Sequence, residues 1–210
     1  MKRVSNGQLH LLTAGHCLDP LVSDPFDTTW LHHADSFGRS REETWLKNGT
    51  RDADVGLITI FSPEYPTDRN QFYYGPTAGT IVKEVVNWAD AVEQVIGSQA
   101  CRFGRTSLRD CDVITAKNVS HVSCVVNVGC MTVSKTNEMG YDSQGGDSGG
   151  PVFYPQSLAS NKIALGTHVH STEGSVGSSG YSWWSPFDTG RNTFNALFGY
   201  TYTLCITDAC

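Results

Sequence analysis

Short apolar runs bounded by turn-forming residues recur along the chain and predict strands rather than long helices. The clearest run, 55–60, is almost wholly apolar, which is typical of a buried strand. The stretch 24–51 is polar and is assigned no strand, whereas 62–80, with its prolines and glycines, is expected to be an extended loop. The expected strands lie just before His16 and at 54–60, 81–86, 113–115, 122–128, 151–154 and 163–169, with a short helix or a final strand within 183–198.

Composition favours the same class of structure. The 210 residues include 21 glycines and only 6 lysines, and abundant Thr, Val, Ser and Tyr favour short strands with tight turns. This length suits one large all-β domain or two small barrels that share an interface. The net charge of −6 argues against nucleic acid as a partner, because a phosphate backbone requires clustered Lys and Arg. The absence of any apolar run of about 18 residues predicts no membrane span.

The sequence Gly-Asp-Ser-Gly-Gly-Pro at 146–151 carries the strongest chemical signal. Such a glycine-rich loop can present the Ser148 hydroxyl beside two backbone N–H groups, those of Gly146 and Ser148 itself. That arrangement is a nucleophile with its oxyanion hole. Serine catalysis also requires a base and an acid that orients the base. The candidates are His16, after a short apolar run, and Asp54, at the start of the buried strand.

Asp52 is the nearest competitor of Asp54 for the role of the acid. It lies two residues further from the apolar run and lacks the Val-Gly-Leu continuation. We therefore assign Asp52 to a solvated turn. The alternative is that all three residues are structural: His16 a core histidine, Asp54 a strand cap and Ser148 a turn residue.

Three motifs follow one another in the order His, Asp, Ser: Thr-Ala-Gly-His-Cys at 13–17, Asp-Val-Gly-Leu at 54–57, and the loop at 146–151. Together they resemble the chymotrypsin-like (trypsin family) serine endopeptidases, with most similarity to streptogrisin-like and glutamyl endopeptidase-like bacterial enzymes. The resemblance implies hydrolysis of peptide bonds through an acyl-enzyme.

The resemblance also implies the architecture. The expected fold is all-β, with two six-stranded antiparallel Greek-key barrels. Residues 1–97 would form the first barrel, with His16 and Asp54, and 98–210 the second, with Ser148 and the specificity pocket. Because only a short segment precedes His16, we expect the first barrel to lack its first strand.

Seven cysteines without a repeated Cys-x-x-Cys spacing indicate a disulfide-bonded protein from an oxidising compartment. We therefore expect secretion, with a signal and propeptide outside this chain. Short spacing makes Cys124–Cys130 and Cys205–Cys210 candidate pairs, although many connectivities are possible. The resemblance to streptogrisin-like enzymes implies a Cys101–Cys111 bridge and leaves Cys17 without an upstream partner.

Asp147 precedes the nucleophile, and a buried carboxylate at that place requires a paired cation. The resemblance to streptogrisin-like enzymes implies that Arg102 is the partner. An ion pair between the two would hold the oxyanion loop open without cleavage of an N-terminus. A surface position for Arg102 is the alternative.

Substrate preference is left open among acidic, basic and other P1 side chains. By resemblance, Asp142, six residues before the nucleophile, would attract Lys or Arg. His168 on the pocket strand, with Ser143 and Ser171 as hydroxyl donors, would instead bind Glu or Asp. The two interpretations conflict, since a buried Asp142 repels an acidic side chain. Gln144 replaces a cysteine of the trypsins, and Asp142 is equally compatible with a turn cap.

The implied chemistry uses no cofactor, and the histidines at 32, 33 and 121 lack a ligand spacing, so we expect no metal. The expected partners are a protein or peptide substrate and protein inhibitors, with no nucleic acid and no membrane, and we expect a monomer. An alternative function is a catalytically inactive secreted domain that keeps the fold and binds a partner through its aromatic-rich end, 181–202.

Overall fold

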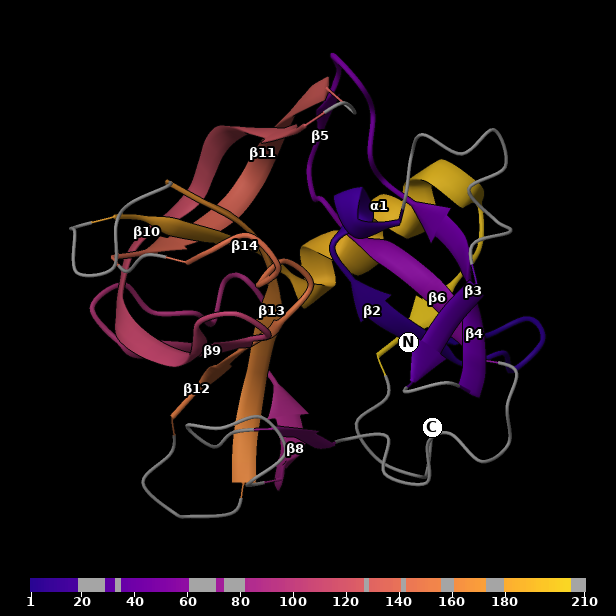
Figure 1. Cartoon of the computed structure of the whole chain (residues 1–210), viewed down its shortest axis with the longest axis horizontal. Coiled ribbons are helices and arrows are strands. Elements are labelled where there is room, and N and C mark those ends of the chain that lie inside the picture. Colours follow the sequence, from indigo (N-terminus) through magenta and orange to yellow (C-terminus); the bar gives the residue numbers. More distant parts are fainter. Residues whose placement is uncertain are drawn as a thin grey trace.

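The computed structural model describes residues 1–18, 29–32, 35–60, 71–73, 82–126, 129–140, 143–155, 161–172 and 180–204. Within them, strands predominate and one α-helix is present (Figure 1), so the all-β prediction is confirmed. The elements are β1 (Lys2–Arg3), β2 (His10–Thr13), the 3-10 helix η1 (Gly15–Cys17), β3 (Thr29–His32), β4 (Asp35–Glu43), β5 (Thr50–Arg51), β6 (Gly56–Ile60), β7 (Gln71–Tyr73), β8 (Val82–Trp88), β9 (Gln99–Gly104), β10 (Leu108–Val125), β11 (Gly129–Met139), β12 (Pro151–Tyr154), β13 (Asn161–Ser171), β14 (Ser182–Pro186), α1 (Phe187–Phe198) and β15 (Tyr202–Thr203).

The smaller sheet has the strand order β2-β6-β4-β3 and is antiparallel. Its central strand β6 buries Leu57 and Ile58 completely or nearly so, as expected for the most apolar run of the chain. β2 pairs with β6 so that Thr13 lies opposite Gly56. This register places the end of β2 beside the start of β6. His16 follows shortly after the end of β2, and Asp54 comes shortly before the start of β6.

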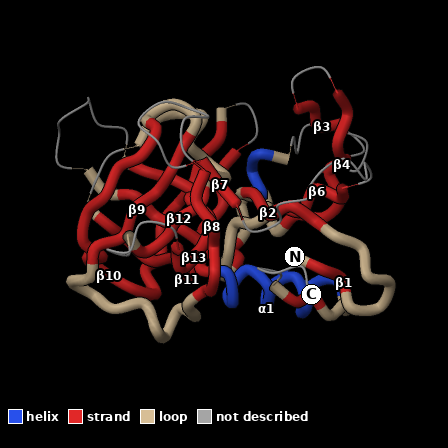
Figure 2. Tube along the Cα trace, turned by 90° about the horizontal axis from the view of Figure 1, so that it is seen from below, coloured by secondary structure: helices blue, strands red, loops and turns tan. Residues whose placement is uncertain are grey.

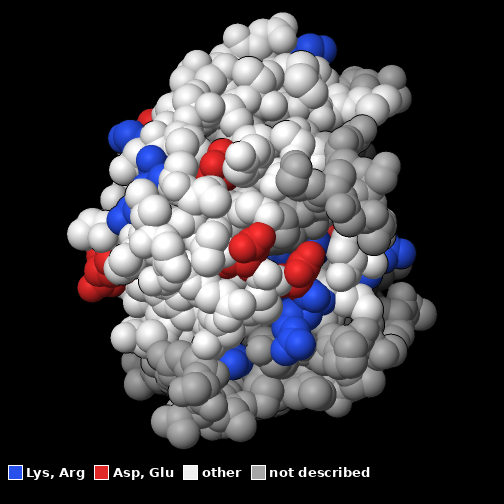
Figure 3. Space-filling model, turned by 90° about the vertical axis from the view of Figure 1, so that its left-hand side faces the viewer, with Lys and Arg blue, Asp and Glu red and all other residues white. Residues whose placement is uncertain are grey.

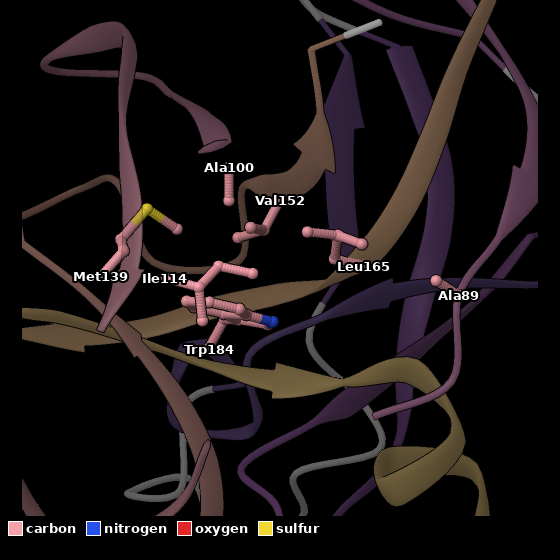
Figure 4. Close-up of a cluster of buried hydrophobic side chains, with 7 residues drawn as sticks. All are labelled: Ala89, Ala100, Ile114, Met139, Val152, Leu165 and Trp184. Atoms are coloured by element: carbon pink, nitrogen blue, oxygen red, sulfur yellow. The ribbon is translucent and has the colours of Figure 1, made fainter. Parts of the chain in front are cut away.

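The larger sheet has the order β12-β9-β10-β11-β14-β13-β8-β7, with β5 added alongside β11. A buried cluster fills its interior, and Figure 4 shows these side chains directed into the space between the strands. Trp184 on β14 is completely buried and is the largest side chain of the cluster. The cluster consists of Ala89, Ala100, Ile114, Met139, Val152, Leu165 and Trp184.

Helix α1 packs beneath the smaller sheet while its N-terminus continues directly from β14 of the larger one (Figure 2). Phe194 is completely buried against Val55, Leu57 and Tyr202. A Cβ on Gly190 would lie 3.0 Å from a Val55 methyl carbon, so the helix approaches the chain closely just after Asp54. The helix therefore links the two sheets through the segment that carries the candidate acid.

Several elements differ from the sequence-based expectations. β3 and β4 lie in the polar stretch 24–51, and β7 lies in the expected loop 62–80. The strand expected at 113–115 and residues 122–125 of the strand expected at 122–128 belong to one long strand, β10, and the stretch 183–198 forms both a strand and a helix. β8 precedes the expected boundary at Gly97 but pairs in parallel with β13 of the larger sheet.

Two of the expected disulfides are confirmed. Cys101 is bonded to Cys111 and Cys124 to Cys130, each pair joining neighbouring strands. Cys17 is a free thiol. The pair Cys205–Cys210 lies outside the described residues.

The face of the molecule on the left of Figure 1 is shown in Figure 3 and is mostly uncharged. Among the described residues on this face, basic and acidic side chains occur in small groups, and near its centre the two signs adjoin. In the part of the chain that the structure describes, no helix is long and apolar enough to cross a membrane.

A buried amide, Gln94, connects strands of the larger sheet. Its Nε2 donates to the carbonyl oxygens of Ala89 at 3.1 Å and Leu165 at 2.9 Å. Its Oε1 accepts from Asn137 Nδ2 at 2.7 Å and Trp184 Nε1 at 3.0 Å. All the hydrogen-bonding capacity of this completely buried side chain is therefore used.

Replacing Gln94 by Leu should lower the free energy of unfolding by about 3 kcal/mol or more, because it leaves buried polar groups unpaired on both sides. Urea denaturation measures this loss, with the exposed Gln99→Leu as the matched control. Equal midpoints for the two variants would contradict a role for the Gln94 network in holding the sheet.

Candidate active site

His16 and Asp54 form a hydrogen-bonded pair at the junction of β2, η1 and β6. His16 Nδ1 lies 2.5 Å from Asp54 Oδ2, and the backbone N–H of His16 donates to Oδ1 at 3.0 Å. The Asp54 side chain is completely buried and that of His16 is 11% exposed. A Cβ on Gly15 would lie 2.7 Å from Oδ1, so only glycine allows this approach of the carboxylate to the turn. The contact at Nδ1 leaves Nε2 as the nitrogen available for a proton transfer.

The backbone around Asp54 is fixed from two directions. Its N–H donates to Ser185 Oγ of β14 at 3.0 Å. Thr44, after β4, donates its hydroxyl to the carbonyl oxygen of Ala53 at 2.6 Å and accepts the N–H of Val55 at 2.9 Å. The carboxylate is thus positioned by residues of both sheets.

The environment of His16 favours its charged form. Burial alone lowers the pKa of His16, but the negative charge of Asp54 and its hydrogen bond raise the pKa well above its usual value. Trp45 packs edge-on against the ring, with centroids 5.8 Å apart. A partly enclosed imidazole with a buried carboxylate on one nitrogen is suited to receive a proton on the other.

The Ser148 loop lies against the strand that leads to His16. A Cβ on Gly149 would collide with the Thr13 hydroxyl, so the two segments are in direct contact. The loop is held to β13 by reciprocal bonds of 2.9 Å, from Gly149 N–H to the His168 carbonyl and from His168 N–H to the Gly150 carbonyl. The loop that carries Ser148 therefore lies against the end of the strand that leads to His16.

The Ser148 hydroxyl donates to the carbonyl oxygen of Val169 at 3.4 Å. Among the described residues no hydrogen bond joins it to His16. In the same part of the chain the N–H groups of Gly146 and Ser148 have no acceptor, whereas the intervening Asp147 N–H donates to the Gln144 carbonyl at 3.1 Å. Two unpaired donors flanking a serine hydroxyl provide a binding place for a negatively charged oxygen.

Arg102 and Asp147 lie side by side in the interior of the larger sheet. Arg102 Nη1 is 2.8 Å from Asp147 Oδ2, and both side chains are completely buried. The second carboxylate oxygen accepts the N–H groups of Thr106 at 2.8 Å and Ser107 at 3.0 Å. A Cβ on Gly104 would collide with both members of the ion pair, so the pair fills the space that this glycine leaves.

The pKa of Asp147 reflects these contacts. Burial raises the pKa of this carboxyl. The N–H donors of Gln144 and Ser107 and the charge of Arg102 outweigh burial and hold the pKa below its usual range. The carboxylate thus stays charged and orders the loop that carries Ser148 from within.

His168, Ser143 and Ser171 form one buried polar group on and beside β13. Ser143 Oγ lies 2.8 Å from His168 Nε2, and the Ser171 hydroxyl donates to the Ser143 carbonyl at 3.1 Å. Burial, followed by the charge of Arg102, lowers the pKa of His168 to about 3, so the ring is neutral. Its Nδ1 is buried and has no hydrogen-bond partner among the residues that the structure describes. Asp142, the other candidate for the pocket, lies outside the described residues.

Aromatic residues without a role predicted from the sequence lie near the site. His121, Trp183 and His170 are stacked, with centroids 4.8 Å apart for His121–Trp183 and 6.0 Å for His170–Trp183. They come from β10, β14 and β13, and no local motif signals their meeting. Trp45 beside His16 is equally without a sequence signal. In the described ranges no group of three or more His, Cys, Asp or Glu side chains is arranged to hold a metal ion.

Solved structures of chymotrypsin-like serine proteases match nearly the whole chain, and the protein therefore has the chymotrypsin-like serine protease fold. Protease A of Thermobifida fusca is similar with a TM-score of 0.64 and 24% identity, over 95% of this chain and 86% of that one. The Nocardiopsis protease NAPase is similar with a TM-score of 0.65 and 21% identity, over 92% and 86%.

A glutamic acid-specific serine protease, described as using a histidine triad in substrate binding, has a TM-score of 0.66 and 21% identity, over 94% of this chain and 88% of that one. No protein-family model matches the chain, and no curated protein matches it in sequence. The likeness thus concerns the fold.

Removing the cation by Arg102→Ala should destabilise the protein by about 3–5 kcal/mol, because it leaves Asp147 buried without a charge partner. Chemical denaturation at neutral pH measures the loss. The matched control is Arg105→Ala, at an exposed position three residues further along. If both variants unfold at the same denaturant concentration, the ion pair does not order the loop.

Proposed function

We propose that this protein is a secreted serine endopeptidase that acts as a monomer on protein or peptide substrates through His16, Asp54 and Ser148. The observation that carries the proposal is the buried Asp54 carboxylate on Nδ1 of His16, beside a serine loop with two unpaired N–H groups. The fold and the two disulfides are consistent with it.

In the proposed reaction, Ser148 Oγ attacks the carbonyl carbon of the scissile peptide bond while His16 Nε2 takes the hydroxyl proton. The N–H groups of Gly146 and Ser148 stabilise the oxyanion, which contributes several kcal/mol to such reactions. His16 then protonates the leaving amine, and water repeats the cycle on the acyl-enzyme. Asp54 stabilises the imidazolium at each stage, and no cofactor takes part.

The Ser148 hydroxyl must leave the Val169 carbonyl to meet His16. Rotation about the Cα–Cβ bond breaks only one long hydrogen bond of 3.4 Å. Bonds between base and nucleophile are often loose in free enzymes and tighten when substrate binds. We therefore assign this rotation to substrate binding.

For the P1 side chain we propose Glu or Asp, bound by His168 with Ser143 and Ser171. The unpaired Nδ1 of His168 and its contact with Ser143 support this choice. The glutamic acid-specific enzyme of the same fold uses histidines in substrate binding, which makes the assignment chemically reasonable. A preference for Lys or Arg through Asp142 is the competing outcome.

A serine-directed fluorophosphonate should label the wild-type chain at Ser148 and should not label Ser148→Ala. Labelling should speed up with rising pH, because only neutral His16 is a base and Asp54 raises its pKa. In Asp54→Asn the rise should move to lower pH, and the maximal rate should fall about 10⁴-fold. A folded wild-type protein that is not labelled at any pH would support the alternative of an inactive binding domain.

Cleavage of a mixed peptide library should occur after Glu or Asp. His168→Gln should reduce kcat/KM for a Glu substrate about 10- to 100-fold, the value of one hydrogen bond to a charged group, with little change for a matched Gln substrate. Cuts after Lys or Arg that persist in His168→Gln would instead point to Asp142.

A further inference from the structure

A second pocket, apart from the serine site, lies where β5, β11 and α1 meet. Its volume is about 350 Å³, at the lower end of the range of about 300–1,000 Å³ typical for small-molecule sites. β5 comes from the segment leading to Asp54 and runs beside β11, as Figure 1 shows. Charged side chains line it on the strand side, Arg51, Asp52 and Lys135, and polar and apolar ones on the helix side, including Thr189, Asn192 and Leu197.

The charges in this pocket are not balanced. Lys135 Nζ is paired with Asp52 Oδ2 at 2.8 Å, and Ser134 donates to the other oxygen of Asp52 at 2.8 Å. Asp52 is therefore bound to β11, while its side chain stays 47% exposed. The Arg51 side chain makes no hydrogen bond or ion pair with any residue that the structure describes, and its Nε is buried. Among the described residues one positive charge of the pocket is thus left without a partner.

The helix side is polar at one end and apolar at the other. Thr189 and Asn192 belong to the N-terminal half of α1 and offer a hydroxyl and an amide group. Leu197, in the last turn, is 40% exposed. A ligand that spans the pocket therefore meets hydrogen-bonding groups first and an apolar surface next.

We propose that this pocket binds a carboxylate that carries a short apolar group. The planar guanidinium of Arg51 matches the two oxygens of a carboxylate. Asn192 hydrogen-bonds a neighbouring amide, and the apolar group covers Leu197. A peptide C-terminus and a short fatty acid share this chemistry. The site takes no part in the proposed peptide hydrolysis.

Binding at this place joins elements from different parts of the fold. The backbone of Arg51 is paired with Val133 of β11, while α1 packs against Val55 and Leu57 of the smaller sheet. Because the site exists only when these elements are assembled, a bound carboxylate raises the thermal midpoint of unfolding.

Isothermal titration of the full chain with N-acetyl-leucine tests the proposal. We expect saturable binding, no binding of N-acetyl-leucinamide, and a higher unfolding temperature with the acid alone. Hexanoate represents the short fatty acid and N-acetyl-leucyl-leucine the peptide C-terminus. Whichever of the two binds more tightly identifies the source, and either result supports the site.

Three variants locate the binding. Arg51→Gln should weaken it about 10- to 100-fold, and Asn192→Asp, an exposed change that folding tolerates, should weaken it by repulsion. Asp52→Asn should tighten it, because it removes the only carboxylate in the pocket lining and frees Lys135. The exposed Lys47→Gln removes the same charge elsewhere and should leave the affinity unchanged.

The proposal is overturned if the wild-type chain shows no saturable binding with ligand up to about 10 mM. A dissociation constant above that concentration would be too weak for a binding site. It is also overturned if the amide binds as well as the acid. Equal affinities of Arg51→Gln, Asp52→Asn and Lys47→Gln would likewise exclude this pocket.

Discussion

The buried carboxylate of Asp54 is the constraint on which the rest of the site depends. An ionised group without solvent is tolerated only where donors surround it, and Asp54 receives two from His16. Those bonds fix the turn after β2, while Ser185 of β14 holds the Asp54 backbone from the larger sheet. The Asp54 side chain is thus held by the turn after β2 and its backbone by β14 of the larger sheet. A histidine in this turn is oriented by folding itself.

A second buried carboxylate, that of Asp147, is likewise held by donors, on the other side of the site. Asp147 is satisfied by Arg102 and by backbone N–H groups, and the N–H groups of its two sequence neighbours have no acceptor among the described residues. Burial lowers the pKa of nearby His168 most, and the positive charge of Arg102 lowers it further, whereas Asp147 raises it. The ion pair thus orders the serine loop from within, in a place where water does not screen it.

The parts of this structure that could be predicted from sequence are those with a local signal. The three motifs mark their own turns, and Cys101–Cys111 and Cys124–Cys130 join adjacent strands. β4 had no such signal, because it is polar: Ser40 and Glu42 are buried, and Glu42 accepts the hydroxyl of Tyr202, far away in sequence. β10 stays one strand across an irregularity at Asn118, which adopts a positive φ of 52°. Only its pairing with β11 reveals this.

The segment between β4 and β6 shows why distant parts of the chain matter to a short motif. Asn48, Thr50 and Asp52 are each bound to β11, close to the Cys124–Cys130 bridge, before the chain turns inward to Asp54. The position of the candidate acid is therefore determined by the hairpin of the larger sheet as well as by its own strand. The pocket beside Arg51 lies on this same connection, because β5 pairs with β11 three residues before Asp54.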